Sequence, residues 1–150
     1  MRILFFCMGN ICRSPVVEAV VRKRFAAAGL DIEVASAGTE DYHVGARADT
    51  RAIASARAAG YDVSAHRARQ LAALDFQHYD HLLAMDQVNL RAARRIGSGD
   101  ADDKLALFLA HAGLADPTEV PDPYYGGAAD FRRVIDLAEA GAEGLIARLR

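Results

Sequence analysis

Apolar residues in the first quarter of the chain form two patterns that predict different elements. Residues 2–6 contain a continuous apolar run, which is typical of a strand buried on both faces. Residues 15–28 place valines and a phenylalanine at helical spacing, and Gly29 then provides a stop signal. Residues 31–37 are predicted as a second strand. This order predicts a strand, a helix and a parallel strand joined by a right-handed crossover.

The rest of the chain repeats these strand and helix patterns. Helices are predicted over residues 46–59, around 71–76, over 88–96 and over 128–150, and strands over 79–85 and 104–109. Gly141 and Gly144 are expected to interrupt the last helix. The glycine- and aspartate-rich residues 97–103 are expected to be flexible, and the proline-rich residues 116–127 to form a long surface loop. The alternation predicts one α/β domain over residues 1–150, a three-layer sandwich with a central four-stranded parallel sheet flanked by helices.

Composition and charge narrow the class of protein. The chain has 150 residues, of which 52% are hydrophobic and 25% charged, as expected for one globular domain. A net charge of −2 without a basic cluster argues against nucleic acid as a partner, and no apolar stretch is long enough to span a membrane. The two cysteines lie in one loop and are expected to be reduced. We therefore expect a cytoplasmic protein that binds neither nucleic acid nor a membrane. A monomer is also expected, although composition and charge do not determine the oligomeric state.

The clearest chemical signal is the polar loop at residues 7–15, between the first strand and the first helix. A helix N-terminus offers unsatisfied N–H groups and a partial positive charge, so the amides of residues 8–13 can turn toward one phosphate group. Arg13 adds a planar guanidinium that matches two phosphoryl oxygens. Thiols beside a cation at a helix N-terminus ionise readily, so Cys7 is expected to act as a thiolate nucleophile. The pattern favours cleavage of a phosphate ester over nucleotide binding, because the glycine and lysine motif of nucleotide-binding loops is absent.

The other residues of this loop suit the same purpose. Gly9 and Asn10 tolerate the positive φ angles that inward-facing amides require. Ser14 is predicted as an N-cap or as a hydrogen-bond donor to the thiolate, and Pro15 fits the first helical turn. The predicted phosphate-binding residues are Met8, Gly9, Asn10, Ile11, Cys12, Arg13 and Ser14.

The two cysteines also allow other interpretations. Taken alone, Cys7 is more typical of a small buried hydrophobe, but the ordered strand, glycine, arginine and proline favour catalysis. Cys12 is either an inert buried thiol or a partner that captures oxidised Cys7 in a reversible disulfide. A zinc site would combine both thiols with His78 and His81, whose spacing matches no common zinc pattern, so no metal is expected.

Five segments together resemble the low-molecular-weight protein tyrosine phosphatases. They are residues 7–15, Ser36-Ala37-Gly38-Thr39, His66-Arg67-Ala68-Arg69-Gln70, Met85-Asp86 and Asp122-Pro123-Tyr124-Tyr125-Gly126. The resemblance extends over nearly the whole chain, and the cysteine loop is highly specific in combination with the Asp-Pro-Tyr-Tyr segment. It implies a phosphotyrosine phosphatase that works without metal or cofactor through a phosphocysteine intermediate. A phosphotyrosine-containing protein is then the expected substrate, and a tyrosine kinase is a candidate partner.

The expected general acid is Asp122. Two aspartates precede a proline, Asp116 and Asp122, and the second is stiffened by prolines on both sides. The resemblance also selects Asp122, which would protonate the leaving phenolate and then act as base for the attacking water. Asp116 is interpreted as a turn residue. The residues expected to line the substrate cleft are Ile11, Tyr42, Tyr124 and Tyr125, with Tyr42 standing where the family commonly has tryptophan.

The resemblance also implies a supporting network. Asn10, Ser36 and His66 match residues with which the family holds a strained asparagine, and Ser14 lies beside the thiolate. Asp86 is expected to cap the helix that follows it. No functional context is evident for His43, His78, His81 and His111.

Three other functions share parts of this pattern. Arsenate reductases on the same scaffold relay electrons through later cysteines, and none follows Cys12. Protein-arginine phosphatases typically have threonine where Ile11 stands, so Ile11 favours phosphotyrosine. A phosphate-binding module without turnover would lack the nucleophile or the acid, whereas this chain has both Cys7 and Asp122.

Overall fold

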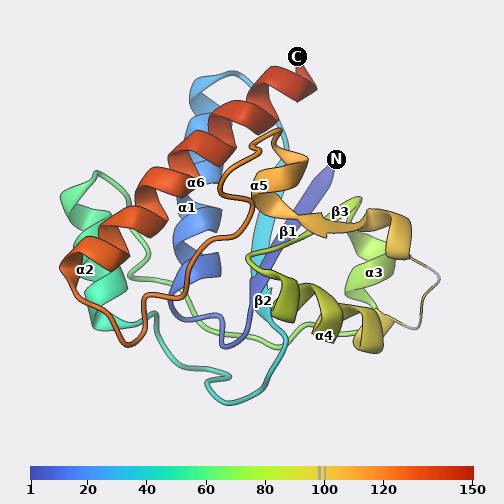
Figure 1. Cartoon of the computed structure of the whole chain (residues 1–150), viewed down its shortest axis with the longest axis horizontal. Coiled ribbons are helices and arrows are strands. Elements are labelled where there is room, and N and C mark those ends of the chain that lie inside the picture. The colour runs from blue at the N-terminus through green and yellow to red at the C-terminus, as the bar shows by residue number, and fades with distance from the viewer. Residues whose placement is uncertain (98, 100) are drawn as a thin grey trace.

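A computed structural model of the protein describes residues 1–97, 99 and 101–150. Over these residues the sheet has four parallel strands, β1 (Arg2–Cys7), β2 (Glu33–Gly38), β3 (His81–Ala84) and β4 (Leu105–Leu107), in the order β2-β1-β3-β4 (Figure 1). The chain moves to one side of β1 to form β2 and to the other side to form β3. Ligands bind beyond the carboxyl ends of the strands at such a switch point. The predicted α/β fold with a four-stranded parallel sheet is confirmed.

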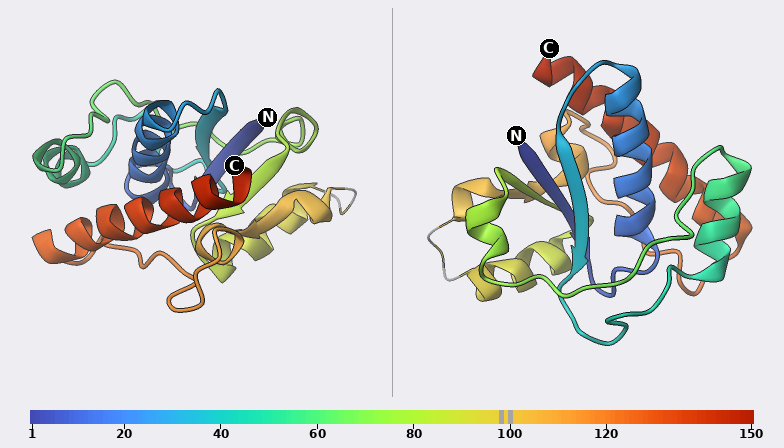
Figure 2. Two further views of the ribbon diagram at one scale, coloured as in Figure 1. Left: turned by 90° about the horizontal axis from the view of Figure 1, so that it is seen from above. Right: turned by 180° about the vertical axis from the view of Figure 1, so that it is seen from behind.

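Helices cover both faces of the sheet (Figures 1 and 2). They are α1 (Arg13–Ala27), α2 (Thr50–Ala58), α3 (Asp75–His78), α4 (Gln87–Gly97), α5 (Phe108–His111) and α6 (Ala128–Leu149), with a short 3-10 turn η1 (Asp102–Lys104). Alternate side chains of β1 enter two cores. Ile3 and Phe5 pack with α1, α5 and α6, whereas Leu4 and Phe6 pack with α3 and α4. The three-layer sandwich is therefore confirmed as well.

Several element boundaries differ from the predicted ones. α2 begins at Thr50 instead of residue 46, because the Asp49 carboxylate caps the helix by accepting a backbone N–H of its first turn at 2.8 Å. The predicted strand at residues 104–109 ends early, since Phe108 starts α5. This change of direction turns the Phe108 ring edge-on against Phe5, with 5.1 Å between ring centroids.

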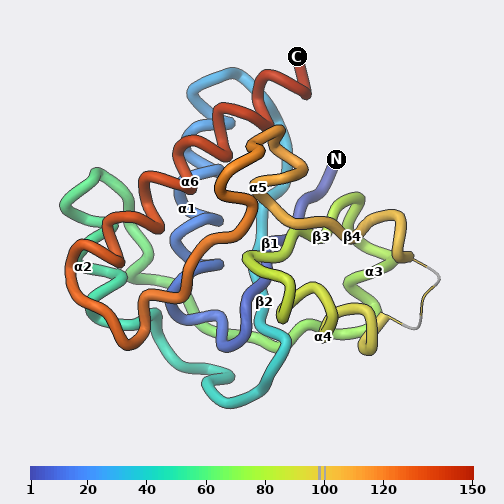
Figure 3. Tube along the Cα trace, viewed as in Figure 1, coloured from blue at the N-terminus to red at the C-terminus, as the bar shows by residue number. Residues whose placement is uncertain are grey.

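The sequence predicts two irregular segments, residues 97–103 and residues 116–127. The predicted flexible segment 97–103 includes residues 98 and 100, which lie outside the described residues. The predicted loop at residues 116–127 joins α5 to α6 and descends toward the carboxyl end of β1 (Figure 3). Within residues 1–97 and 101–150, no helix combines the length and the apolar character needed to cross a membrane.

α6 continues through Gly141 and Gly144, where the sequence predicts interruptions. Each glycine instead marks a close approach of the chain around α5. A Cβ atom at Gly141 would overlap the ring of Phe108, and one at Gly144 would overlap the carbonyl oxygen of Ala112. Close packing on α6, and not helix termination, accounts for both residues.

Replacing Gly141 by Ala is expected to lower stability by about 1–3 kcal/mol, because overpacking against Phe108 outweighs the better helix propensity of alanine. The measurement is the free energy of unfolding in denaturant. Ala140→Gly, on the exposed side of the same helix, is the control and should cost about 1 kcal/mol through propensity alone. A Gly141→Ala variant more stable than the wild type would contradict the close contact.

Candidate active site

A strained asparagine shapes the loop between β1 and α1. Asn10 is fully buried and has φ 59°, the one positive φ outside glycine among the described residues. Its Nδ2 donates to Ser14 Oγ at 2.8 Å and to Ser36 Oγ at 3.0 Å. Its Oδ1 accepts the backbone N–H of Arg69 at 3.1 Å, and its carbonyl oxygen accepts from His66 Nε2 at 2.7 Å. The structure thus brings together the four predicted supporting residues and adds the backbone of Arg69, which the sequence does not reveal.

The thiol of Cys7 lies at the end of β1, against the first turn of α1. Its Sγ is hydrogen-bonded to Ser14 Oγ at 3.0 Å and accepts the backbone N–H of Asn10 at 3.3 Å. Ser14 Oγ accepts from Asn10 Nδ2, and its own proton can be donated to the sulfur at 3.0 Å or to the Ala37 carbonyl oxygen at 3.5 Å. α1 begins at Arg13, so Ser14 is not the N-cap, and of its two predicted roles the structure supports the contact with the thiol. A sulfur between two donors at a helix N-terminus is well placed to carry negative charge.

Arg13 is the buried cation of the site. Its side chain is only 4% exposed, and Nη1 donates to Asp86 Oδ2 at 2.6 Å and to the Val120 carbonyl oxygen at 3.0 Å. Its Nη2 lies 3.8 Å from Asp122 Oδ2. Burial opposes the charge, but the neighbouring Cys7 sulfur and Asp86 carboxylate outweigh burial and raise the pKa of Arg13 above its ordinary value. Arg13 therefore stays charged beside the thiol.

Asp86 has a second contact that the sequence analysis missed. Its Oδ1 accepts the backbone N–H of Asn89 at 2.8 Å, as expected of a residue that caps α4. Its Oδ2 holds Arg13, which stands 73 positions earlier in the chain. The only advance signal was the position of Asp86 directly after β3, because parallel strands end at the same edge of a sheet.

Asp122 approaches the site from the loop before α6. Its side chain is 50% exposed, and its Oδ1 accepts the backbone N–H of Tyr124 at 3.1 Å. The rings of Tyr124 and Tyr125 meet edge-to-face, with 5.0 Å between centroids. Asp116, the other aspartate before a proline, does not line the cavity that Asp122 borders.

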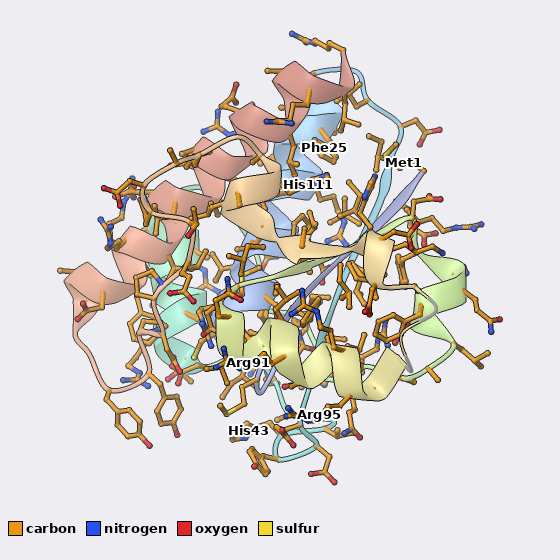
Figure 4. The ribbon with its side chains drawn as sticks, turned by 45° about the vertical axis from the view of Figure 1, so that its right-hand side comes forward. Met1, Phe25, His43, Arg91, Arg95 and His111 are labelled. Atoms are coloured by element: carbon orange, nitrogen blue, oxygen red, sulfur yellow. The ribbon has the colours of Figure 1, made fainter. Side chains whose placement is uncertain are left out.

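A cavity of about 410 Å³ opens above the cysteine loop. Its walls are Cys7, Met8, Gly9, Ile11, Cys12, Arg13, Tyr42, His43, Asp122, Tyr124 and Tyr125. All predicted cleft residues are therefore present, and His43 is an addition for which the sequence offered no signal. His43 projects from the loop after β2 (Figure 4), and a Cβ atom at Gly9 would lie 2.9 Å from its ring. Gly9 thus gives His43 room to rest against the loop.

Cys12 belongs to the same loop and to the wall of the cavity, but its electrostatic setting differs from that of Cys7. Burial, together with the nearby charges of Asp49, Cys7 and Asp122, raises the pKa of Cys12 to about 12. Cys12 is therefore a protonated thiol, and the thiolate is the form that attacks in disulfide exchange. This favours the inert interpretation of Cys12, while the capture of oxidised Cys7 stays a prediction. In the described part of the chain, no three His, Cys, Asp or Glu side chains are arranged to hold a metal ion.

The end of β2 supports the cysteine loop from below. Gly38 pairs in register with Cys7, and a Cβ atom at Gly38 would lie 2.7 Å from the carbonyl oxygen of Met8. The backbone N–H groups of Thr39 and Glu40 donate to the carbonyl oxygens of Cys7 and Met8 at 2.9 and 3.0 Å. A side chain at position 38 would therefore push against the loop. The sequence marks Gly38 only as part of a recognised segment.

The loop is suited to bind a phosphate group, because backbone N–H groups at the helix N-terminus and Arg13 can surround it. A thiol in such a loop is typical of enzymes that cleave phosphate esters with a cysteine nucleophile. The comparison with known families is more specific. The chain belongs to the low molecular weight phosphotyrosine protein phosphatase family, whose model matches residues 2–150. The resemblance noted in the sequence is confirmed.

Proteins similar to this chain occur in organisms that are only distantly related to one another. The low molecular weight protein-tyrosine-phosphatase of Streptomyces coelicolor is 41% identical, over 99% of this chain and 93% of its own. The low molecular weight phosphotyrosine protein phosphatase of Sus scrofa is 38% identical, over 88% of this chain and 85% of its own. A crystal structure of a protein tyrosine phosphatase from Entamoeba histolytica, with Hepes in its active site, superimposes with a TM-score of 0.94. That protein is 38% identical, and the match covers 99% of this chain and 96% of its own.

Proposed function

We propose that the protein hydrolyses phosphotyrosine in proteins, with Cys7 as nucleophile, Arg13 as phosphate ligand and Asp122 as general acid and base. The observation that carries the proposal is the convergence of these three groups on one cavity. The thiol and the guanidinium come from one loop, and Asp122 Oδ2 lies 3.8 Å from Arg13 Nη2 although it belongs to a loop more than a hundred positions later. A nucleophile, a group that stabilises negative charge and a proton donor can then act on the same bound phosphate ester.

The first step transfers the phosphoryl group to the enzyme. The dianion is held by the loop amides and by Arg13, and the Cys7 sulfur attacks phosphorus from the side opposite the phenolic oxygen. The S–P bond forms as the P–O bond breaks. Asp122, in its protonated form, gives its proton to the leaving oxygen, so that tyrosine departs neutral.

The second step returns Cys7 to its starting state. A water molecule takes the place of the tyrosine, and the Asp122 carboxylate removes one of its protons as the oxygen attacks phosphorus. The S–P bond breaks, inorganic phosphate leaves, and Asp122 is protonated again for the next cycle. Ser14 supports both steps, because its hydroxyl can donate to the sulfur whenever the sulfur carries charge.

The walls of the cavity support an aryl ester as substrate. Tyr42 and Tyr125 are 69% and 96% exposed, and Tyr124 is 39% exposed, so aromatic faces line the way to Cys7. Aromatic rings stack well on a flat phenyl group. Ile11 adds an apolar wall beside the loop, which suits a phenyl ring better than a charged guanidinium. Arsenate reduction is not favoured, because the sequence holds no cysteine beyond Cys7 and Cys12 to relay electrons.

The same proposal includes the substrate, the partner, the oligomeric state and the cellular compartment. A phosphotyrosine-containing protein is the substrate, and the tyrosine kinase that makes it is a candidate partner. Residues 1–150 act as one catalytic domain, which works as a monomer in the cytoplasm. Free thiols at Cys7 and Cys12 support a reducing compartment.

One peptide made with phosphotyrosine, phosphoserine or phosphoarginine at the same position tests the substrate class. The value of kcat/KM for phosphotyrosine should exceed that for phosphoserine by about 10²-fold or more, because serine lacks the ring and is a poorer leaving group. The readout is release of inorganic phosphate under matched conditions. Faster hydrolysis of phosphoarginine would instead assign the protein to the protein-arginine phosphatases.

A further inference from the structure

An arginine outside the cavity contacts the loop that carries the general acid. Arg51, in the first turn of α2, has its guanidinium carbon 5.4 Å from the ring centroid of Tyr124 and 4.7 Å from that of Phe131. Tyr124 stands two positions after Asp122, and its backbone N–H is hydrogen-bonded to the Asp122 carboxylate at 3.1 Å. A guanidinium at these distances attracts the faces of both rings.

Arg51 is itself held in place by Asp49. Its Nε lies 3.1 Å from Asp49 Oδ1 and its Nη2 lies 2.9 Å from Oδ2, a two-point contact that orients the guanidinium plane. The hydrogen bonds from Arg51 also hold the pKa of Asp49 below its ordinary value, so the pair stays charged at neutral pH.

The same aspartate is attached to the loop that carries the nucleophile. The backbone N–H of Asp49 donates to the carbonyl oxygen of Ile11 at 2.9 Å. Contacts therefore run without a gap from the Cys7 loop through Asp49 and Arg51 to Tyr124 and on to Asp122. The two catalytic loops are linked through the start of α2.

The acid loop is anchored at Val120, whose N–H donates to the Met85 carbonyl oxygen at 2.8 Å, and at Pro123, which is buried. The hydrogen bonds recorded within residues 122–126, from Tyr124 N–H to Asp122 and from Gly126 N–H to the Pro123 carbonyl oxygen, are internal to the loop. Half of the Asp122 side chain and nearly all of Tyr125 are exposed. Between these anchors and α6, the carboxylate and Tyr124 are held from outside the loop by the ion pair of Asp122 with Arg13, at 3.8 Å, and by the contact of Tyr124 with Arg51.

We propose that Arg51 is a positioning residue for the general acid, which holds Tyr124 and with it Asp122 over the phosphate loop. The inference rests on the proposed function and deepens it. Arg51 does not line the cavity and touches no reacting atom. Without it, Asp122 would spend less time within reach of the leaving oxygen, so the loss should grow as the leaving group needs its proton more.

The test compares two substrates that differ in this need, phenyl phosphate and 4-nitrophenyl phosphate. Arg51→Met keeps an apolar side chain against Phe131 and removes both the positive charge and the two guanidinium N–H groups that bind Asp49. It should lower kcat/KM, which reports the transfer of the phosphoryl group to Cys7, about three- to ten-fold for phenyl phosphate and much less for 4-nitrophenyl phosphate. Arg51→Lys, which keeps the positive charge but not the two coplanar N–H donors, should recover part of the loss. Arg57→Ala, at an exposed arginine in the last turn of the same helix, is the matched control and should have no effect.

The decisive arm repeats Arg51→Met in an Asp122→Asn background. If Arg51 acts through the acid, its replacement should cause no further loss of kcat/KM for phenyl phosphate once the acid is gone. Thermal melting of every variant separates positioning from unfolding, and if Arg51→Met does not fold, the Arg51→Lys variant carries the same comparison.

Three outcomes would overturn the inference. They are an Arg51→Met variant with wild-type kcat/KM for phenyl phosphate, a loss of kcat/KM equal for both substrates, and a loss that persists in the Asp122→Asn background. A higher inhibition constant for inorganic phosphate would assign Arg51 a direct electrostatic effect on phosphate instead. Failure of the proposed function looks different, because the wild-type protein would then hydrolyse neither aryl phosphate.

Discussion

Replacing Cys7 by Ser is expected to lower turnover of a phosphotyrosine peptide by about 10⁴-fold or more. A serine hydroxyl is far less acidic and far less nucleophilic than a cysteine thiol, so the attack on phosphorus loses its nucleophile. The side chain is almost fully buried and the replacement is nearly isosteric, so the fold should persist. The measurements are kcat for the purified variant, its melting temperature and its affinity for inorganic phosphate.

The matched control for this variant is Cys12→Ser. The Cys12 thiol, with its pKa raised to about 12, contributes no thiolate at neutral pH, so its replacement should cost far less activity than that of Cys7. Mass spectrometry of wild-type enzyme quenched during turnover should also find the phosphoryl group on Cys7. Retained turnover in Cys7→Ser, or a phosphoryl group on another residue, would disprove the assigned nucleophile.

Replacing Arg13 by Lys is expected to reduce kcat/KM by about 10²–10³-fold, although the charge is conserved. Lysine cannot donate from two coplanar nitrogens to two phosphoryl oxygens. It would also give up one or both of the contacts that Nη1 makes with Asp86 at 2.6 Å and with the Val120 carbonyl oxygen at 3.0 Å. The measurement is steady-state kinetics with 4-nitrophenyl phosphate, whose good leaving group lessens the need for a proton from Asp122 in the first step.

Arg94→Lys, at an exposed position of α4, is the control for this substitution and should leave the kinetics unchanged. Comparison of inorganic phosphate binding in the two variants separates ground-state binding from transition-state stabilisation. If Arg13→Lys kept full kcat and lost only phosphate affinity, the guanidinium would serve binding alone, and the proposed role in the transition state would be wrong.

Most of the predictions that the structure confirms rest on patterns within short stretches of the sequence. The strand at β1 was predictable because it is buried on both faces and therefore continuously apolar. The Cys7 loop was predictable because the thiol, the turn residues and the arginine are contiguous in the chain, so their proximity could be expected without knowledge of the fold. The α6 boundaries followed from helical spacing over 22 residues.

The errors arose where a distant contact overrides a local preference. Gly141 and Gly144 indicate helix breaks by propensity, yet α6 runs through both because the chain around α5 packs closely against it. Phenylalanine is common in strands, but Phe108 begins the helix α5, and in that position its ring packs edge-on against Phe5. Propensity differences of about 1 kcal/mol per residue are smaller than such packing terms.

By itself the sequence determined the fold class, the nucleophilic loop and the expected acid, because periodicity and contiguous motifs encode them. Only the tertiary structure decided how these parts meet. It placed Asp86 on Arg13, Gly38 beneath the loop and His43 in the cavity wall, and it connected Asp49 and Arg51 to both catalytic loops. Each of these contacts joins segments far apart in the chain. Their geometry depends on strand order and register, which no local pattern records.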